Sequence, residues 1–303
     1  MTELPSITVI VCTYRRPGQL QELLDSLRVQ HVQGLRPRLC IVDNDAEQSA
    51  RAVVEQAQAN FPWPLQYVVQ PVKNIALTRN AGLATVTTDY LAFIDDDEVA
   101  VPQWLHSLVA LARESKAQLV FGPVLPVYPQ EIRPWLVSGG FYERPRHVTG
   151  TLLPLLEART GNVLLDAALL QGQSLQFDET LGLSGGEDYA FFEHLYQQGA
   201  KAVWSDEAVV TEAVPADRAT PNWLLKRSFR IGSVEASLMR RSVRVQSLLR
   251  MWVKVAYLMA RNGVMLLAAP LRSKALNFRL VRNLAIAAGI VYGLVNGPYR
   301  EYK

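Results

Sequence analysis

Apolar and polar positions alternate in blocks over the first hundred residues. Continuous apolar runs, rich in β-branched residues, are typical of strands buried on both faces. Such runs predict strands at 6–13, 39–42, 65–69 and 90–94. Leucines at helical spacing predict a helix at 19–30, and further helices are expected at 46–60 and 75–84. Strands alternating with helices predict an α/β fold with a doubly wound, mostly parallel sheet.

The pattern is less regular after residue 101. Pro102 opens a further helix, and the Pro-, Gly- and aromatic-rich stretch 123–146 predicts a loop. A glycine-rich turn at 182–186 precedes a helix at 187–198. Thr220-Pro221 predicts another helix start, because proline suits the first helical position. Short strands are expected at 119–121, 202–204 and 208–211.

The C-terminal segment from residue 243 has a different pattern. One helical face carries Arg250, Lys254, Tyr257 and Arg261, and the other carries Leu249, Trp252, Val253, Ala256, Met259, Gly263 and Leu267. This arrangement predicts a basic amphipathic helix. Residues 283–299 follow with 17 uncharged positions, at the lower limit for crossing a bilayer. We expect a re-entrant or interfacial helix there, and the alternative is a helical hairpin packed on the domain or on a second subunit.

The net charge of +3 conceals an asymmetry along the chain. Residues 226–303 contain 15 Lys/Arg but only two acids, whereas the preceding 225 residues contain 16 basic and 26 acidic side chains. A basic, apolar tail on an acidic body suggests that the tail faces anionic lipid or phosphate. Nucleic acid is the other anionic partner, and the apolar content of the tail argues against it.

The start of the chain and its cysteines suggest a cytoplasmic protein. No basic segment precedes the first apolar run, so we expect no signal peptide and a cytoplasmic location. Cys12 and Cys40 lie in strand-like runs and are expected to be buried thiols. The four histidines lack the spacing of metal ligands.

The acid run Asp95-Asp96-Asp97-Glu98 directly follows a predicted strand. Adjacent carboxylates repel one another unless a cation offsets their charge. Mg²⁺ and Mn²⁺ take one or two carboxylates and complete their shell with phosphate oxygens and water. The run therefore predicts a metal–diphosphate site. The alternative is a helix N-terminus, which also favours negative charge.

Four further polar clusters follow other predicted strands or the glycine turn. Carboxylates in Ser184-Gly185-Gly186-Glu187-Asp188 could act as a general base, and the alternative is a helix cap. Arginines in Thr13-Tyr14-Arg15-Arg16 could hold phosphate, and the alternative is a basic surface turn. Asp43-Asn44-Asp45 could bind a base or ribose or form a turn, and Arg79-Asn80-Ala81-Gly82 is the weakest signal. The sequence has neither the dinucleotide-binding glycine motif nor a P-loop.

In this order, the motifs resemble those of family 2 glycosyltransferases with the GT-A fold. The matching segments are VIVCTYRRP, IVDND, NIALTRNAGL, YLAFIDDDEVAVPQWL and GGEDYAFFEHL. The closing segment AVVTEAVPADRATPNWLLKRSFRIG looks like that of bacterial exopolysaccharide enzymes of the succinoglycan type. The resemblance covers residues 6–232.

The resemblance implies a role for each matching residue. Asp188 would be the general base, with Glu187 as the alternative. Asp95 and Asp97 would form the Asp-x-Asp pair, with Asp95 near the ribose and Asp97 on the metal. Asp96-x-Glu98 is the competing register. Relatives often carry a histidine near Glu212, which puts a metal or phosphate role there in doubt. The nucleotide and its diphosphate would be held by Thr13, Tyr14, Arg15, Asp43, Asp45, Arg79, Asn80, Asp95, Asp96, Arg227 and Arg230.

The resemblance also implies a domain order and a reaction. Residues 1–242 would form the glycosyltransferase domain, with a nucleotide-sugar half at 1–100 and an acceptor half at 101–242, and residues 243–303 a helical extension. The enzyme would transfer a sugar from a nucleotide-diphosphate donor, with UDP as the leading candidate. The reaction would need Mn²⁺ or Mg²⁺ and would invert the configuration at the anomeric carbon. The acceptor would be a polyprenyl-diphosphate-linked glycan at the inner face of the membrane. The rival interpretations are a nucleotidyltransferase and a non-catalytic scaffold.

Overall fold

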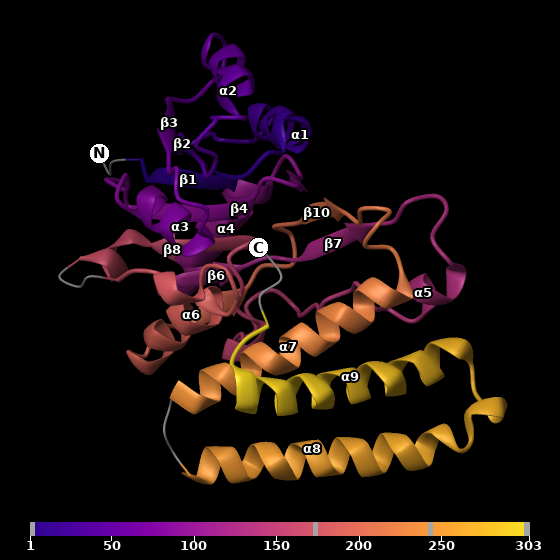
Figure 1. The fold of residues 1–303 in the computed structure, drawn as a ribbon. Coiled ribbons are helices and arrows are strands. Elements are labelled where there is room, and N and C mark those ends of the chain that lie inside the picture. The colour runs from indigo at the N-terminus through magenta and orange to yellow at the C-terminus, as the bar shows by residue number, and fades with distance from the viewer. Residues whose placement is uncertain (1–3, 172–174, 242–244, 300–303) are drawn as a thin grey trace. The chain divides into compact units, whose positions relative to one another are not determined.

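The computed structural model describes residues 4–171, 175–241 and 245–299 (Figure 1). The chain folds into two compact units. The first comprises Met1–Pro126, Arg144–Gly182 and Glu187–Ala213, and the second comprises Val127–Glu143, Leu183–Gly186 and Val214–Lys303. The expected boundary at residue 242 falls within the second unit, between α7 (Pro221–Arg241) and α8 (Val245–Leu266).

A seven-stranded sheet forms the centre of the first unit, in the order β3-β2-β1-β4-β8-β6-β9. The strands β1, β2, β3 and β4 are mutually parallel neighbours, and only β8 runs antiparallel to its two neighbours. The predicted α/β class with a mostly parallel sheet is therefore confirmed. The strands are β1 (Ser6–Thr13), β2 (Arg36–Asp43), β3 (Leu65–Val69), β4 (Tyr90–Asp95), β6 (Leu119–Phe121), β8 (Asn162–Asp166) and β9 (Ala202–Trp204).

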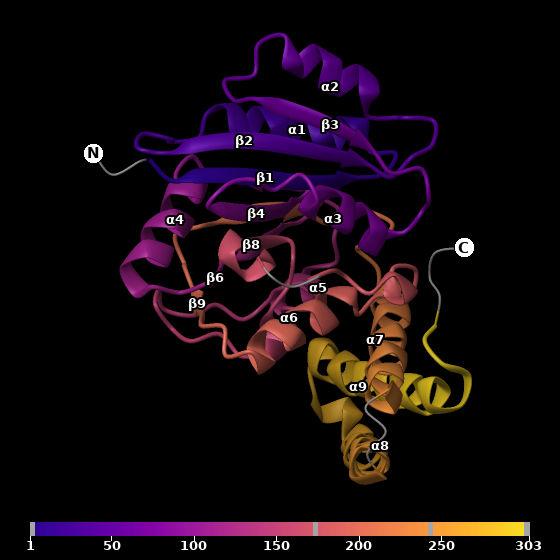
Figure 2. The same cartoon turned by 90° about the vertical axis from the view of Figure 1, so that its left-hand side faces the viewer.

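Helices cover both faces of this sheet (Figure 2). Because side chains alternate along a strand, Val9 and Val11 pack into one apolar core and Ile10 into the other. The first core also receives the apolar faces of α1 (Pro17–Arg28), α2 (Arg51–Gln58) and α4 (Trp104–Ser115). The second core receives those of α3 (Ile75–Leu83) and α6 (Glu187–Gln197).

Element boundaries differ from the predicted ones where side chains fix a turn. The helix α1 begins two residues earlier than expected, at Pro17, which suits the first helical turn. The helix α2 begins at Arg51 rather than at residue 46, because the Asp43 carboxylate accepts bonds from the amides of Asp45 and Ala50. Those bonds hold residues 46–50 in turns.

The predicted loop at 123–146 is wrong in two places. It contains β7 (Val124–Val127) and α5 (Pro134–Ser138). A second, three-stranded sheet has the order β5-β10-β7, with β5 at Glu98–Ala100 and β10 at Val210–Ala213, two residues later than expected. The strands β5, β7 and β8 were missed because they are short and pair with partners distant in sequence.

The second unit contains α7, α8 and α9 (Lys274–Asn296), of which α8 and α9 form a helical hairpin (Figure 1). The helices α7 and α9 pack along each other through glycines. A Cβ at Gly289 would collide with the Phe229 carbonyl oxygen, and one at Gly293 with the Ser233 carbonyl oxygen. Close backbone approach at these positions therefore requires glycine.

Among the described residues, α9 is the one helix long and apolar enough to cross a membrane, by length and composition alone. Its mean hydropathy over the most apolar window is 1.5. The predicted segment 283–299 corresponds to the later part of this helix and the residues after it. Its packing on α7 matches the hairpin that was the alternative to an interfacial helix.

Replacing Gly289 by alanine should destabilise the second unit by about 1–3 kcal/mol, the usual cost of overpacking. The collision is with backbone, which cannot rotate away. Gly263→Ala in α8 is the matched control, because its methyl group would have no atom within 4 Å among the described residues outside its chain neighbours and the adjoining backbone of α8. We expect that control to be neutral or stabilising, by up to about 1 kcal/mol. Urea denaturation of both variants checks this, and equal midpoints would contradict it.

Candidate active site

The polar clusters predicted from the sequence meet at one edge of the large sheet. Thr13 and Asp43 are paired at the ends of the parallel strands β1 and β2, and Asp95 ends the parallel strand β4 opposite Cys12. Ligands of doubly wound sheets bind at the carboxyl ends of the strands. The three clusters that follow β1, β2 and β4 therefore belong to one candidate site.

Arg16 and Thr13 bind two carboxylates of the acid run, those of Asp96 and Asp97. Thr13 Oγ1 donates to Asp96 Oδ2 at 2.8 Å, and Arg16 Nη1 lies 3.0 Å from Asp96 Oδ1 and 2.8 Å from Asp97 Oδ2. One guanidinium thus offsets two carboxylates of the run. Even so, burial first and the neighbouring Asp97 second raise the pKa of Asp96 above its ordinary value.

Asp95 and Glu98 form a second pair of carboxylates on the other side of the run. Glu98 is buried and accepts a hydrogen bond from the Asp95 amide at 3.0 Å. A Cβ at Gly161 would come within 2.8 Å of Glu98 Oε1 and 3.1 Å of Asp95 Oδ2, so a side chain there would displace both carboxylates. Burial, together with Asp97 and Asp96, raises the pKa of Asp95 to about 7, and burial raises that of Glu98 well above its usual range.

Exposure distinguishes the two possible registers of the acid pair. The Asp96 side chain is 6% exposed and bonded to two partners, whereas that of Asp97 is 17% exposed. Glu98 is buried, and Asp95 is partly accessible. The accessible carboxylates are therefore those of Asp95 and Asp97, which favours Asp95-x-Asp97 over Asp96-x-Glu98.

A buried ion pair connects α3 to the start of α6. Arg79 Nη1 lies 2.6 Å from Glu187 Oε1, and both side chains are about nine-tenths buried. Burial opposes the charged form of Arg79, but the negative charges of Glu187, Asp95 and Asp188 outweigh it and raise its pKa. Arg79 therefore lies in the field of both the acid run and the Glu187-Asp188 motif.

Glu187 and Asp188 have different environments although they are neighbours in sequence. Burial raises the pKa of Glu187, against the effect of Arg79, and its Oε2 has no hydrogen-bond partner among the described residues. Asp188 is partly exposed, and its Oδ1 accepts a bond from the Tyr189 amide. The accessible carboxylate of the motif is that of Asp188, and Glu187 is a partner of Arg79.

The cluster after β2 forms a turn held by its own carboxylates. Asp43 is fully buried and accepts bonds from the Tyr67 hydroxyl at 2.7 Å and from two backbone amides. Asp45 binds the Arg15 guanidinium at 3.1 and 3.2 Å, which lowers the pKa of that carboxyl. The structure therefore gives these residues a structural part, and their expected contact with the nucleotide stays a prediction.

Asn80 and Tyr14 also occupy defined places. The Asn80 amide donates to the Phe177 carbonyl at 3.0 Å and accepts from the Phe177 amide at 2.7 Å. This positions the Phe177 ring, over which the Arg79 guanidinium lies at 5.4 Å. The Tyr14 ring lies beneath the Arg15 and Lys73 cations, 5.4 and 5.3 Å from its centroid.

Arg227 and Arg230 belong to α7 in the second unit. The Arg227 guanidinium lies 5.2 Å from the centroid of the Trp223 ring. Their expected role at the diphosphate stays a prediction.

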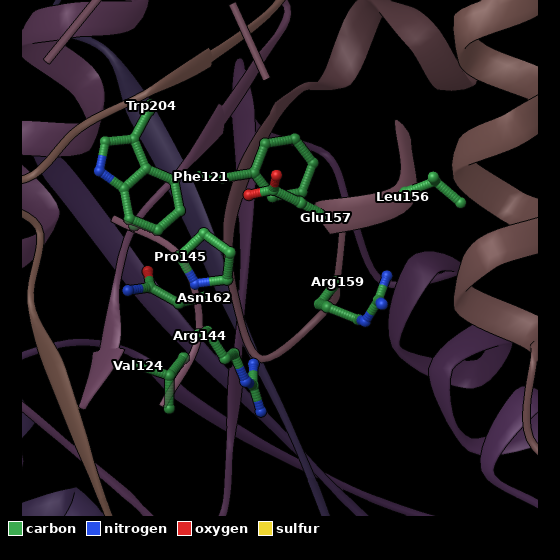
Figure 3. A pocket seen from close by; sticks show the side chains of 10 residues that line it. Phe121, Val124, Arg144, Pro145, Leu156, Glu157, Arg159, Asn162 and Trp204 are labelled. Atoms are coloured by element: carbon green, nitrogen blue, oxygen red, sulfur yellow. The ribbon is translucent and has the colours of Figure 1, made fainter. Parts of the chain in front are cut away.

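A small pocket of about 130 Å³ lies in the first unit (Figure 3). Arg144 lines it and lies 3.6 Å from Glu212, which pairs with Glu98 across β5 and β10. Asn162 also lines it, and its side chain bonds Trp104 and the carbonyls of Pro123 and Ala208. The other lining residues are Phe121, Gly122, Val124, Pro145, Leu156, Glu157, Arg159 and Trp204.

Sequence reasoning assigned no individual role to Arg16 or Arg144, which the structure adds to the candidate site. Arg16 lay in a cluster already singled out for phosphate binding, and its two bonds to the acid run are a tertiary feature. Arg144 lay in a stretch predicted to be loop. Because Arg144 is far from Glu98 in sequence, no sequence pattern connects the two residues.

The described residues contain no group of three or more His, Cys, Asp or Glu side chains arranged to hold a metal ion. Both cysteines are free thiols, and Cys40 is buried as expected, whereas Cys12 is partly accessible. A metal at this site would therefore need ligands from outside the chain. The diphosphate and water that complete the shell of Mg²⁺ or Mn²⁺ are such ligands.

Comparison with known proteins decides the family. The model of "Glycosyl transferase family 2" matches residues 8–160. The chain belongs to this family. "Succinoglycan biosynthesis protein ExoM" of Rhizobium meliloti is 39% identical over 297 residues, which cover 95% of this chain and 93% of that protein. "Glucosyl-dolichyl phosphate glucuronosyltransferase" of Haloferax volcanii is 26% identical over 243 residues, 74% of each chain.

Solved structures confirm the expected GT-A glycosyltransferase fold. "Mannosyltransferase PcManGT from Pyrobaculum calidifontis in complex with GDP-Man and Mn2+" has a TM-score of 0.64 at 16% identity, covering 97% of this chain and 88% of that one. S. aureus TarS 1-349 in complex with UDP-GlcNAc has a TM-score of 0.56 at 17% identity, covering 95% and 91%. At such low identity the likeness concerns the fold alone.

Proposed function

We propose that this family 2 glycosyltransferase moves a sugar from a nucleotide diphosphate to a hydroxyl of a lipid-linked glycan, with inversion, in exopolysaccharide synthesis. The pathway is inferred from the 39% identity to a succinoglycan biosynthesis protein. The observation that carries the chemistry is the buried Arg79–Glu187 ion pair at 2.6 Å. It holds the start of α6, and hence Asp188, in the field that also includes Asp95.

The donor set fits a divalent cation. Asp95 and Asp97 are the accessible oxygens of the run, and Mg²⁺ or Mn²⁺ at nucleotide sites uses one or two carboxylates. Burial is the main cause of the raised pKa of Asp95, and the charges of Asp97 and Asp96 add to it; a cation would relieve that repulsion. When bound, such an ion would stabilise negative charge on the departing diphosphate. A similar fold binds GDP-Man and Mn²⁺ in the mannosyltransferase.

The protein's own residues have separable parts in the reaction. Asp188 accepts the proton of the acceptor hydroxyl, whose oxygen forms a bond to the anomeric carbon as the bond to the diphosphate breaks. Attack from the face opposite the diphosphate inverts the configuration. Arg79 holds Glu187 and offsets the charge of the acid edge, and Arg16 keeps Asp96 and Asp97 in place.

The donor base is inferred to be uracil, because the bound ligand of TarS is UDP-GlcNAc. GDP stays an alternative because the mannosyltransferase binds GDP-Man. The basic C-terminal segment supports a lipid-linked acceptor, and we propose that the enzyme works at the cytoplasmic face of the membrane.

A thermal-shift screen of UDP, GDP, dTDP and CMP, with and without Mn²⁺, tests the donor site. A ligand at about 100 times its dissociation constant adds ~2.7 kcal/mol, which should raise the melting temperature by roughly 5–10 °C. We expect a Mn²⁺-dependent shift with one nucleotide, lost in Asp97→Ala. Asp25→Ala is the matched control, since this aspartate is exposed on α1.

A shift that Asp97→Ala retains in full would contradict the assignment of that residue. No shift with any nucleotide would reject the donor site. Binding without sugar transfer would support the non-catalytic scaffold instead.

A further inference from the structure

One face of α8 presents a continuous apolar stripe to solvent. Its members span an arc of about 160° at 100° per residue and contain no charge: Trp252, Val253, Ala256, Tyr257, Met259, Ala260, Gly263 and Val264, with Leu267 directly after the helix. Val253 is 61% exposed, Val264 67% and Leu267 84%. Leu271, in the corner between α8 and α9, is 89% exposed. A contiguous exposed apolar surface of this kind marks an interaction site.

The opposite face of α8 packs against the other helices of the second unit. Met251 and Val255 are buried against α7 and α9 in one apolar cluster. Asn262 is also buried and accepts a hydrogen bond from Asn283 of α9 at 3.1 Å. The stripe lies outside this buried cluster, and its apolar character needs another cause.

The charges on α8, α9 and the segment between them are of one sign. Residues 245–296 contain seven Lys/Arg and no Asp or Glu. Arg261 lies at the edge of the stripe over the Tyr257 ring, 5.7 Å from its centroid, and Lys254 pairs with Glu235 of α7. An apolar stripe bordered by cations suits a surface with an apolar interior and anionic headgroups. A second copy would bring a helix of the same charge, which disfavours a dimer through this face.

The helix α9 is the other apolar candidate, and its contacts keep it in the protein. Gly289 and Gly293 lie against the backbone of α7 at Phe229 and Ser233, as does Gly232 of α7 against Ile286 of α9. Insertion of α9 into a bilayer would break these backbone contacts. It would also expose the cluster of Ala236, Met251, Val255 and Ile290.

We propose that α8 lies in the plane of an anionic bilayer, with its stripe toward the acyl chains, while α9 stays packed on α7. This proposal rests on the proposed function in one respect, the location at a membrane. It adds which face of α8 contacts the bilayer. Side chains of residues 241–250, including Leu249 and Arg250 from the predicted faces, lie outside the described part of the chain.

Flotation of the full chain with vesicles of phosphatidylcholine, with and without 30% phosphatidylglycerol, tests this proposal. We expect binding to the anionic vesicles and a loss of at least about tenfold in the partition coefficient for Val253→Glu/Val264→Glu. Val29→Glu/Val148→Glu carries the same charge change at exposed valines of the first unit and should bind like the wild type. Quenching of tryptophan fluorescence by brominated lipid should disappear in Trp252→Phe.

The position of α9 is tested by Val295→Glu, at a residue of α9 that is 70% exposed. Binding like the wild type is expected, and a loss equal to that of the α8 variant would overturn the in-plane arrangement. No binding of the wild type to anionic vesicles, or a wild-type dimer that the α8 variant converts to a monomer, would overturn the proposal. The nucleotide-dependent thermal shift is measured without lipid, so it separates failure of this proposal from failure of the donor site.

Discussion

Replacing Asp188 by asparagine is expected to lower sugar transfer by about 10²–10⁴-fold, the usual contribution of a general base. Asparagine has nearly the same shape as aspartate but cannot accept the proton of the acceptor hydroxyl. Donor binding should be retained, because asparagine keeps the side-chain oxygen that accepts a bond from the Tyr189 amide. Transfer rates and the nucleotide-dependent thermal shift, measured on the same preparation, check both parts.

The matched control is Glu193→Gln, which removes a carboxylate from the same helix one and a half turns later. Glu193 contacts the Tyr189 hydroxyl at 3.4 Å and has no proposed part in the chemistry. We expect activity near that of the wild type. Full transfer by Asp188→Asn would reject Asp188 as the base, and loss of both transfer and nucleotide binding would indicate a structural part instead.

Replacing Arg79 by methionine is expected to destabilise the protein by roughly 3–5 kcal/mol, because it leaves Glu187 as an uncompensated buried charge. Glu187 can escape this cost only by taking up a proton. Its pKa is already raised in the presence of Arg79, and it should rise further without it. A buried acid with a raised pKa loses stability as pH increases, so the loss should be larger at pH 8 than at pH 6.

The double variant Arg79→Met/Glu187→Gln separates the charge from the packing. Glutamine cannot ionise, so the pH dependence of the destabilisation should disappear and part of the stability should return. Denaturation by urea at several pH values measures all four members of the cycle. Equal losses in the single and double variants at every pH would show that Arg79 acts through packing alone.

Much of the first unit could be predicted because its signals are local. Ser6–Thr13, Leu65–Val69 and Leu119–Phe121 are apolar runs with the length of buried strands, and they coincide with β1, β3 and β6. Helix α6 begins at Glu187 as expected, after Gly185 and Gly186 at positive φ. By contrast, β5 and β8 are strands because of partners that lie far away in sequence.

The candidate site also has features that the sequence predicted and features that it could not predict. The sequence identified the acid run and the Glu187-Asp188 motif, because four adjacent acids and a glycine turn are unusual on their own. It could not choose between the Asp95-x-Asp97 and Asp96-x-Glu98 registers. Exposure favours the first register, and exposure depends on Thr13 and Arg16, which contact the run from another strand and its loop.

The sequence by itself determined the order of strands and helices up to β4, the edge at which the polar clusters meet, and the family resemblance that comparison confirmed. These follow from periodicity and from the rule that parallel strands end at a common edge. Only the tertiary structure decided that Arg79 binds Glu187 and leaves Asp188 accessible, and that α9 packs on α7 while the stripe of α8 faces solvent. Those outcomes depend on which side chains shield one another from water, and neighbours in space decide that rather than neighbours along the chain.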